Sequence, residues 1–107
     1  MTADELARAI AGGQPPAILD VRTPEEFAAG HVPGAINVPF NQVGRRAGEI
    51  PAAHDTVLVV YCGHGPRAWL AARALRARGF RRVEFLKGHW AGWRKKRPGP
   101  FLRQPAQ

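Results

Sequence analysis

The sequence predicts an α/β protein in which a parallel sheet of four to five strands carries helices on both faces. Short apolar segments alternate along the chain with longer segments that begin with helix-start signals, and this alternation is typical of βαβ units. The apolar segments lack a strict alternation with polar residues, which is expected of strands buried on both faces. The chain has 107 residues, 45% of them hydrophobic, and is therefore of a size for one domain.

The first third of the chain holds two helix starts of the same kind. Thr2 and Thr23 each stand three residues before a glutamate, which is the spacing of a capping box. Helices are therefore predicted over residues 2–10 and 24–29, and glycines follow both segments. Between them, residues 17–21 form a short apolar run that predicts a buried strand.

The rest of the chain predicts three more strands and three helices. Residues 35–38, 57–61 and 83–86 are apolar runs of strand length, and 57–61 is the most strongly apolar. A helix that ends at Arg78 is predicted after residue 65, because Ala68, Ala71, Ala72 and Leu75 recur at helical spacing. We also expect a weak helix near residues 43–50 and a short one at 88–95.

Composition excludes several classes of protein. No apolar segment approaches the roughly 18 residues of a membrane span, and the acidic first residues are unlike a signal peptide. The single cysteine, Cys62, excludes an internal disulfide and a Cys-x-x-Cys pair. The four histidines are scattered, so we expect no metal site and no other cofactor. A lone thiol without an export signal predicts a cytoplasmic protein with no membrane association.

Charge is unevenly distributed along the chain. Of the net charge of +8, residues 1–61 contribute −3 and residues 62–107 contribute +11. Such a field attracts anions and raises their encounter rate. Charge alone does not decide whether the anionic partner is a nucleic acid, a membrane surface or a small substrate. The basic end has no repeated interleaving of aromatic and basic residues, so we expect no nucleic-acid function.

Cys62 stands at the carboxyl end of the predicted strand 57–61, where open α/β sheets bind their ligands. Residues 63–67 follow and read Gly-His-Gly-Pro-Arg. The two glycines permit a tight turn whose N–H groups point inward, and the next helix adds its dipole. Both effects favour a thiolate, so the pKa of Cys62 is expected below the free value of about 8.5. The alternative interpretation of Cys62 is a small buried hydrophobic residue.

Arg67 is the second candidate catalytic residue. A cation in the first turn of a helix opposes the dipole at a cost of about 0.3–1 kcal/mol, so helix stability does not explain it. The cation is useful if it faces an anion held by the loop. Pro66 suits the first helical position. His64 has three interpretations, which are a hydrogen-bonding loop residue, an exposed spacer and a proton donor to the substrate.

Four ordered motifs resemble those of the single-domain rhodanese family of sulfurtransferases. They are Leu19-Asp20-Val21-Arg22 with residues 24–27, residues 30–39, residues 60–67, and Leu86-Lys87-Gly88-His89 with Trp93. The resemblance implies a rhodanese-like three-layer fold for residues 1–97, followed by a Pro-containing basic tail, residues 98–107. The chain departs from the family pattern at His89, which replaces the second glycine of the closing motif.

The resemblance also implies a mechanism. Cys62 takes a sulfur atom from a small anionic donor, thiosulfate or 3-mercaptopyruvate, and becomes a persulfide. Cyanide, a thiol or a sulfur-accepting protein then removes the sulfur, since the chain has no second cysteine. In this interpretation Cys62 and Arg67 are catalytic. The substrate-binding residues are Gly63, His64, Gly65 and Pro66, and the structural supports are Asp20, Arg22 and His31.

Two other functions stay open. One is a non-catalytic rhodanese-like module that binds or regulates a partner, although an inactive module usually lacks the nucleophile. The other is a Cys-dependent phosphatase, but the related phosphatases have one more residue between Cys and Arg. The donor is open as well. Relatives that prefer thiosulfate often carry a cation at the position of Gly63, whereas a neutral residue there resembles members that use mercaptopyruvate.

Trp69 is predicted on the polar face of the helix after the loop, at the same angle as Arg73 and Arg76. An exposed tryptophan near a reactive thiol needs a partner to shield it. We expect residues 98–107 to cover it, in preference to a second subunit or a sulfur-accepting protein.

Overall fold

The computed structural model describes residues 1–96 and contains four helices, two short 3₁₀ helices and four strands over that range. The helices are α1 (Ala3–Ala11), α2 (Pro24–Ala29), α3 (Pro66–Ala77) and α4 (His89–Lys96), and the 3₁₀ helices are η1 (Phe40–Gln42) and η2 (Ala47–Glu49). The strands are β1 (Ala17–Asp20), β2 (Ile36–Asn37), β3 (Val57–Tyr61) and β4 (Arg82–Phe85).

The four strands form one parallel sheet in the order β2-β1-β3-β4, which confirms the predicted sheet. β3 is central and pairs with two neighbours, so that Val60 lies opposite Leu19 on β1 and Phe85 on β4. Because all strands run in the same direction, their carboxyl ends meet at one edge of the sheet. The loops that follow Asp20, Tyr61 and Phe85 are therefore brought together there.

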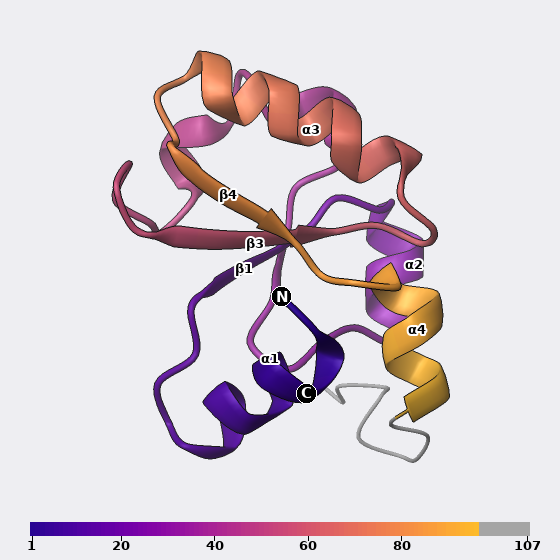
Figure 1. Cartoon of the computed structure of the whole chain (residues 1–107). Helices are drawn as coiled ribbons and strands as arrows, with labels where there is room; N and C mark the ends of the chain where they lie inside the picture. Colours follow the sequence, from indigo (N-terminus) through magenta and orange to yellow (C-terminus); the bar gives the residue numbers. More distant parts are fainter. Residues whose placement is uncertain (97–107) are drawn as a thin grey trace.

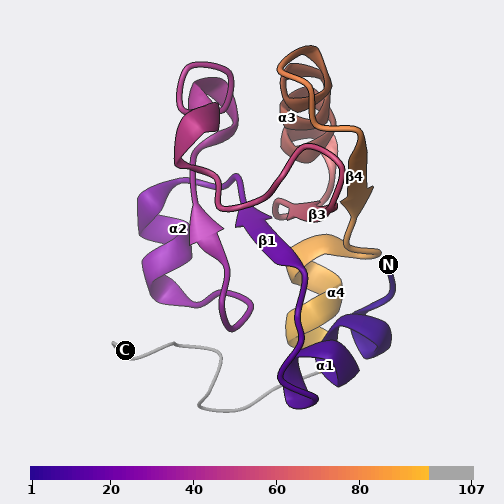
Figure 2. The same ribbon diagram turned by 90° about the vertical axis from the view of Figure 1, so that its left-hand side faces the viewer.

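Helices cover both faces of the sheet, as predicted. Figures 1 and 2 show α3 over one face, whereas α1, α2 and α4 lie toward the other. Side chains alternate along β3 with the period of two expected of a strand. Val59 and Tyr61 join the cluster that contains Leu6 of α1 and Trp93 of α4. Leu58 and Val60 join the cluster beneath α3.

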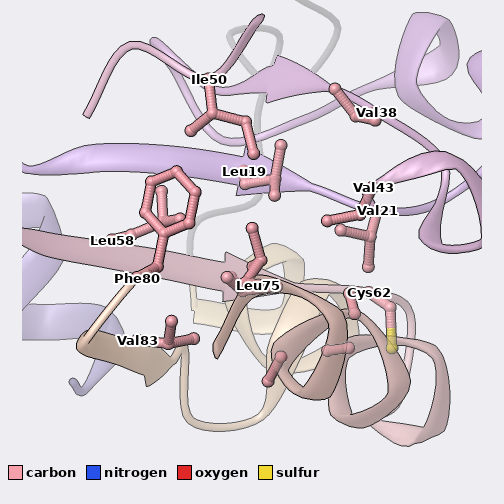
Figure 3. Close-up of a cluster of buried hydrophobic side chains, with 14 residues drawn as sticks. Leu19, Val21, Val38, Val43, Ile50, Leu58, Cys62, Leu75, Phe80 and Val83 are labelled. Atoms are coloured by element: carbon pink, nitrogen blue, oxygen red, sulfur yellow. The ribbon is translucent and has the colours of Figure 1, made fainter. Parts of the chain in front are cut away.

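Cys62 belongs to the cluster beneath α3. Figure 3 shows it at one end of that cluster, with Phe80 and Val83 toward the other. The α3 residues in this cluster are Ala68, Ala71, Ala72 and Leu75, which are the residues of the predicted apolar face. Their small side chains allow α3 to lie close to the sheet. The amino end of α3 is thereby held beside the end of β3.

Both predicted capping boxes are present. The Thr2 hydroxyl accepts a bond from the N–H of Glu5 at 3.0 Å, and the Glu5 carboxylate accepts one from the N–H of Thr2 at 2.8 Å. Thr23 and Glu26 make the same pair of bonds at 3.2 and 3.0 Å. These bonds satisfy N–H groups that have no partner within the helix, and therefore fix where α1 and α2 begin.

The predicted helix over residues 43–50 is wrong. That segment contains only η2 and turns, although Val43 and Ile50 are buried as the apolar pattern indicates. Gly44 and Gly48 each cost about 1 kcal/mol relative to alanine inside an α-helix, which is enough to favour turns in so short a segment.

Trp69 and Leu70 are the exposed large hydrophobic side chains of residues 1–96, at 53% and 47% exposure. The guanidinium of Arg73 lies 5.4 Å from the Trp69 ring centroid. The expected cover, residues 98–107, lies outside the described residues. No helix within residues 1–96 is long and apolar enough to cross a membrane.

Candidate active site

The candidate site lies where β3 ends and α3 begins. Cys62 follows directly after Tyr61, the last residue of β3, and Pro66 is the first residue of α3. The intervening residues 63–65 must reverse the chain direction within three residues. The Cys62 side chain is fully buried beneath this loop.

Backbone N–H groups converge on the Cys62 sulfur. The N–H of Gly65 donates to Sγ at 3.0 Å, and the nearby N–H groups of His64 and Ala68 add to the stabilisation of the thiolate. Burial by itself raises the pKa of Cys62, because it disfavours the charged form. The contact with the His89 side chain and the three N–H groups together outweigh burial and lower the pKa to about 7. The direction is the one predicted from the loop.

The two glycines of the loop have different roles. Gly65 has φ +139°, a conformation that L side chains rarely adopt. Gly63 is not among the residues with positive φ. A Cβ on Gly63 would lie 3.2 Å from Nη2 of Arg67, so a side chain there requires the Arg67 guanidinium to move slightly. The loop therefore needs glycine for its conformation at position 65 only.

Arg67 forms a two-pronged ion pair with Glu26. Its Nη1 and Nη2 donate to the two carboxylate oxygens at 2.7 and 3.2 Å. The bond from Arg67 lowers the pKa of Glu26 to about 2, and Glu26 in turn raises the pKa of Arg67. The charge of Cys62 raises the pKa of Arg67 further, which places the guanidinium within electrostatic reach of the thiolate. Glu26 was predicted only as a capping residue.

Asp20 and Arg22 form a buried ion pair at the carboxyl end of β1. Nη2 of Arg22 donates to Oδ2 of Asp20 and to the carbonyl of Gly30, both at 2.7 Å. Both side chains are essentially inaccessible to solvent. The Arg22 guanidinium also stacks over the Trp90 ring at 4.7 Å. The pair thus ties β1, the end of α2 and α4 together below the loop.

His31 follows the end of α2 and contacts Phe27. Its Nδ1 is 2.7 Å from the carbonyl oxygen of Phe27, and the two rings stack with centroids 3.6 Å apart. His64 is exposed on the outer side of the loop. Within residues 1–96 there is no group of three or more His, Cys, Asp and Glu side chains that could hold a metal ion.

The first residues of α4 hold the Cys62 loop from the opposite side to α3. The N–H of Cys62 donates to Nδ1 of His89 at 3.2 Å. The N–H of Trp90 donates to the carbonyl of Cys62 at 2.9 Å, and that of Ala91 to the carbonyl of Gly63 at 3.2 Å. His89 was identified in the sequence only as a departure from a motif. The parallel pairing of β3 and β4 is the signal that places it here, since residues that follow the two strands meet at the same edge.

A sequence model of the rhodanese-like domain matches residues 2–96. The chain belongs to the rhodanese-like domain family. This confirms the resemblance read from the four motifs.

Two relatives of this rhodanese-like chain are named as sulfurtransferases. The sulfurtransferase of Allochromatium vinosum is 33% identical over 90 residues, which cover 84% of this chain and 82% of the relative. The thiosulfate sulfurtransferase PspE of Escherichia coli is 42% identical over 71 residues, covering 65% of this chain and 67% of the relative.

Solved structures show the same fold. The Alr3790 protein of Anabaena superposes with a TM-score of 0.80 at 32% identity, covering 94% of this chain and 88% of that one. The human single-domain sulfurtransferase TSTD1 superposes with a TM-score of 0.77 at 27% identity, covering 90% and 95%. The three-layer architecture is therefore that of rhodanese-like domains.

Proposed function

We propose that this rhodanese-like chain is a sulfurtransferase that carries sulfur as a persulfide on Cys62. The observation that supports this best is the hydrogen bond from the N–H of Gly65 to the Cys62 sulfur, in a setting that lowers the pKa of this thiol to about 7. Thiolates, and not thiols, are the nucleophilic form of cysteine. The sulfurtransferase relatives support the same class of reaction. Its setting is the cytoplasm, where a lone thiol stays reduced.

In the first half-reaction, the Cys62 thiolate attacks the outer sulfur of the donor. A bond forms between Sγ and that sulfur, and the bond that joined the sulfur to the rest of the donor breaks. The leaving group keeps the electron pair of the broken bond, and departs as sulfite from thiosulfate or as pyruvate, after protonation, from mercaptopyruvate. The N–H groups that hold the thiolate are positioned to bond the anionic persulfide as well.

In the second half-reaction, cyanide or a thiolate attacks the outer sulfur of the persulfide. The bond between the two sulfur atoms breaks, and the electron pair returns to Cys62 as the thiolate. The products are thiocyanate or a persulfide on the acceptor. Since Cys62 is the only cysteine, the chain has no internal thiol to take the sulfur.

Arg67 supports the proposal as the group that receives the charged end of the donor. A guanidinium has five N–H donors, and Glu26 accepts bonds from two of its nitrogens. The ion pair holds the Arg67 side chain in place, so less rotamer entropy is lost when the donor binds. Asp20, Arg22 and His31 act as structural supports, and residues 63–66 contact the donor.

The proposal is favoured over the two other functions by particular residues. A non-catalytic module has no use for a thiol whose pKa is lowered to about 7. A phosphatase needs a wider loop, whereas here Arg67 is the fifth residue after Cys62.

The proposal is tested by steady-state transfer of sulfur to cyanide, followed as thiocyanate. Either thiosulfate or mercaptopyruvate is varied at several fixed cyanide concentrations. We expect parallel double-reciprocal lines, because the donor leaves before the acceptor binds. Cys62→Ser should abolish transfer, and Cys62→Ala is the matched control for any residual activity of the hydroxyl. Transfer by either variant at the rate of the native chain would contradict the proposal.

A further inference from the structure

His89 is the one non-glycine residue of the described chain with a positive φ, at 53°. It stands at the amino end of α4, directly after Gly88, which also has a positive φ. Residues other than glycine are strained at positive φ, and such strain persists where the surrounding structure enforces it. The strain at His89 lies beside the nucleophile, and the sulfur-transfer mechanism above assigns His89 no part.

The hydrogen bond from the N–H of Cys62 determines the tautomer of the neutral His89 ring. Nδ1 accepts this bond at 3.2 Å, so the proton of the neutral ring is on Nε2. Nε2 faces the loop, since it lies 3.4 Å from the position that a Cβ on Gly65 would occupy. The ring therefore contacts the loop at both of its ends. One end accepts from the residue before the turn, and the other lies against the residue that donates to the sulfur.

The other charged groups near Cys62 do not duplicate this contact. Arg67 of α3 acts on the sulfur through its charge and is held by Glu26 of α2. At the end of β1, Asp20 and Arg22 neutralise one another. His64 is on the exposed side of the loop, and the nearest ring from β4 is that of Phe85, 6.1 Å from the His89 centroid.

We propose that His89 is a positioning residue that holds the Cys62 loop in its anion-binding conformation, and thereby keeps the N–H of Gly65 on the Cys62 sulfur. The strained backbone is the cost of placing that ring over the loop. The contact with the His89 side chain also favours a lowered pKa of Cys62. The inference deepens the proposed function, because it concerns the nucleophile on which that function rests.

His89→Gly tests the proposal because it should change the ionisation of Cys62 and leave the stability of the fold nearly unchanged. Glycine removes the ring but adopts a positive φ without strain. Its greater freedom in the unfolded chain offsets this relief, so we expect little change in thermal stability. The pH midpoint for alkylation of Cys62 by iodoacetamide should rise by about one unit, which lowers the rate at pH 7 about fivefold. At high pH, where every thiol is ionised, the rates of the variant and the native chain should converge.

Two further variants complete the experiment. His89→Asn tolerates the left-handed conformation and keeps an acceptor for the N–H of Cys62, so its midpoint should lie between those of the native chain and His89→Gly. His54→Asn is the matched control, because the His54 ring packs on Phe80, remote from the sulfur, and its midpoint should be native.

An unchanged midpoint in His89→Gly would overturn the proposal, and so would a loss of stability without a shift. Alkylation requires no sulfur donor. A chain that failed to transfer sulfur would therefore contradict the proposed function without affecting this result.

Discussion

Cys62 is subject to two opposing influences on its ionisation. Burial in the cluster beneath α3 disfavours the thiolate, and N–H groups of the loop together with the contact from His89 favour it. Each charge-assisted hydrogen bond is worth about 1.5–3 kcal/mol, so several together outweigh the burial. The result is a thiol that is about half ionised near pH 7. The sequence allowed two interpretations of Cys62, a core side chain and a nucleophile, and a buried thiol with a lowered pKa is compatible with both.

The pH dependence of sulfur loading follows from this balance. Under single-turnover conditions with thiosulfate, the loading rate should rise through a midpoint at about pH 7 and level off above it, since the thiolate fraction increases as pH rises through the pKa. Rapid-quench mass measurement of the loaded fraction gives the rate. A rate that still climbs steeply above about pH 8.5 would show that the loop does not stabilise the thiolate.

Gly63 is the position at which donor preference should be adjustable. Gly63→Arg adds a cation at the loop, and should raise kcat/KM for dianionic thiosulfate relative to mercaptopyruvate about 1.4- to 5-fold, since one exposed charge contact is worth about 0.2–1 kcal/mol. Gly63→Ala is the matched control, because both variants place a Cβ 3.2 Å from Nη2 of Arg67.

A preference that changes equally in the two Gly63 variants would assign the effect to displacement of Arg67. An unchanged preference in Gly63→Arg would show that the donor is recognised elsewhere, most directly by Arg67.

The sequence alone predicted the site residues that lie within one local segment of the chain. Cys62, Gly65 and Arg67 were predicted because a strand end, a turn and a helix start are adjacent in the chain. The Glu26 partner of Arg67 is 41 residues away, and its capping role already accounted for it. His89 is 27 residues from Cys62, and its contact depends on the turn after β4, which local pattern does not define.

At the scale of elements, the strands and the capped helices were predictable because each has a strong local cause. The capping boxes of α1 and α2 fix their starts, and the apolar run of β3 fixes a central strand. The segment between β2 and β3 was not predictable in the same way. Val43 and Ile50 have helical spacing, but tertiary burial holds them in turns, and the two glycines lower the cost of leaving the helix.

The ion pair between Glu26 and Arg67 links α2 to α3 and should contribute measurably to stability. Glu26→Gln removes the charge but keeps an acceptor suitable for a capping box. Because the pair is partly exposed, we expect a loss of about 0.2–1 kcal/mol at pH 7 by urea unfolding. Glu26→Ala removes the bond to the N–H of Thr23 as well, and should lose up to about 1 kcal/mol more.

The pH dependence of this difference has a definite sign. The folded pKa of Glu26 is lowered to about 2, so its contribution is present above the unfolded pKa and is lost as pH falls through the folded value. The stabilities of the native chain and Glu26→Gln should therefore converge as pH approaches 2. A constant difference from neutral to acidic pH would mean that the ion pair contributes nothing.

At the scale of the whole molecule, the parallel sheet and the charge of the chain both bear on the proposed reaction. The sheet brings the ends of β1, β3 and β4 to one edge. The second part of the chain, which begins at Cys62, carries a net charge of +11. We expect a field from this excess of positive charge to attract an anionic donor.

This field predicts a dependence on ionic strength. The kcat/KM for thiosulfate should fall severalfold between about 0.01 M and 0.3 M sodium chloride, over which the Debye length falls from about 30 Å to well below 10 Å. Mercaptopyruvate carries one carboxylate charge and should show a weaker dependence, which makes it the internal control. Equal slopes for the two donors would indicate a general effect of salt on the protein, and a flat profile for thiosulfate would contradict steering by the field.

The central claim is that Cys62 carries the transferred sulfur, and intact-mass measurement tests it most directly. The chain is incubated separately with thiosulfate and with mercaptopyruvate, freed of donor and weighed before and after addition of cyanide. The account predicts a gain of one sulfur atom with at least one donor, its location on Cys62 by peptide mapping, its loss with cyanide, and no gain in Cys62→Ser. A native chain that gains no sulfur from either donor, or a Cys62→Ser chain that does gain it, would contradict the account.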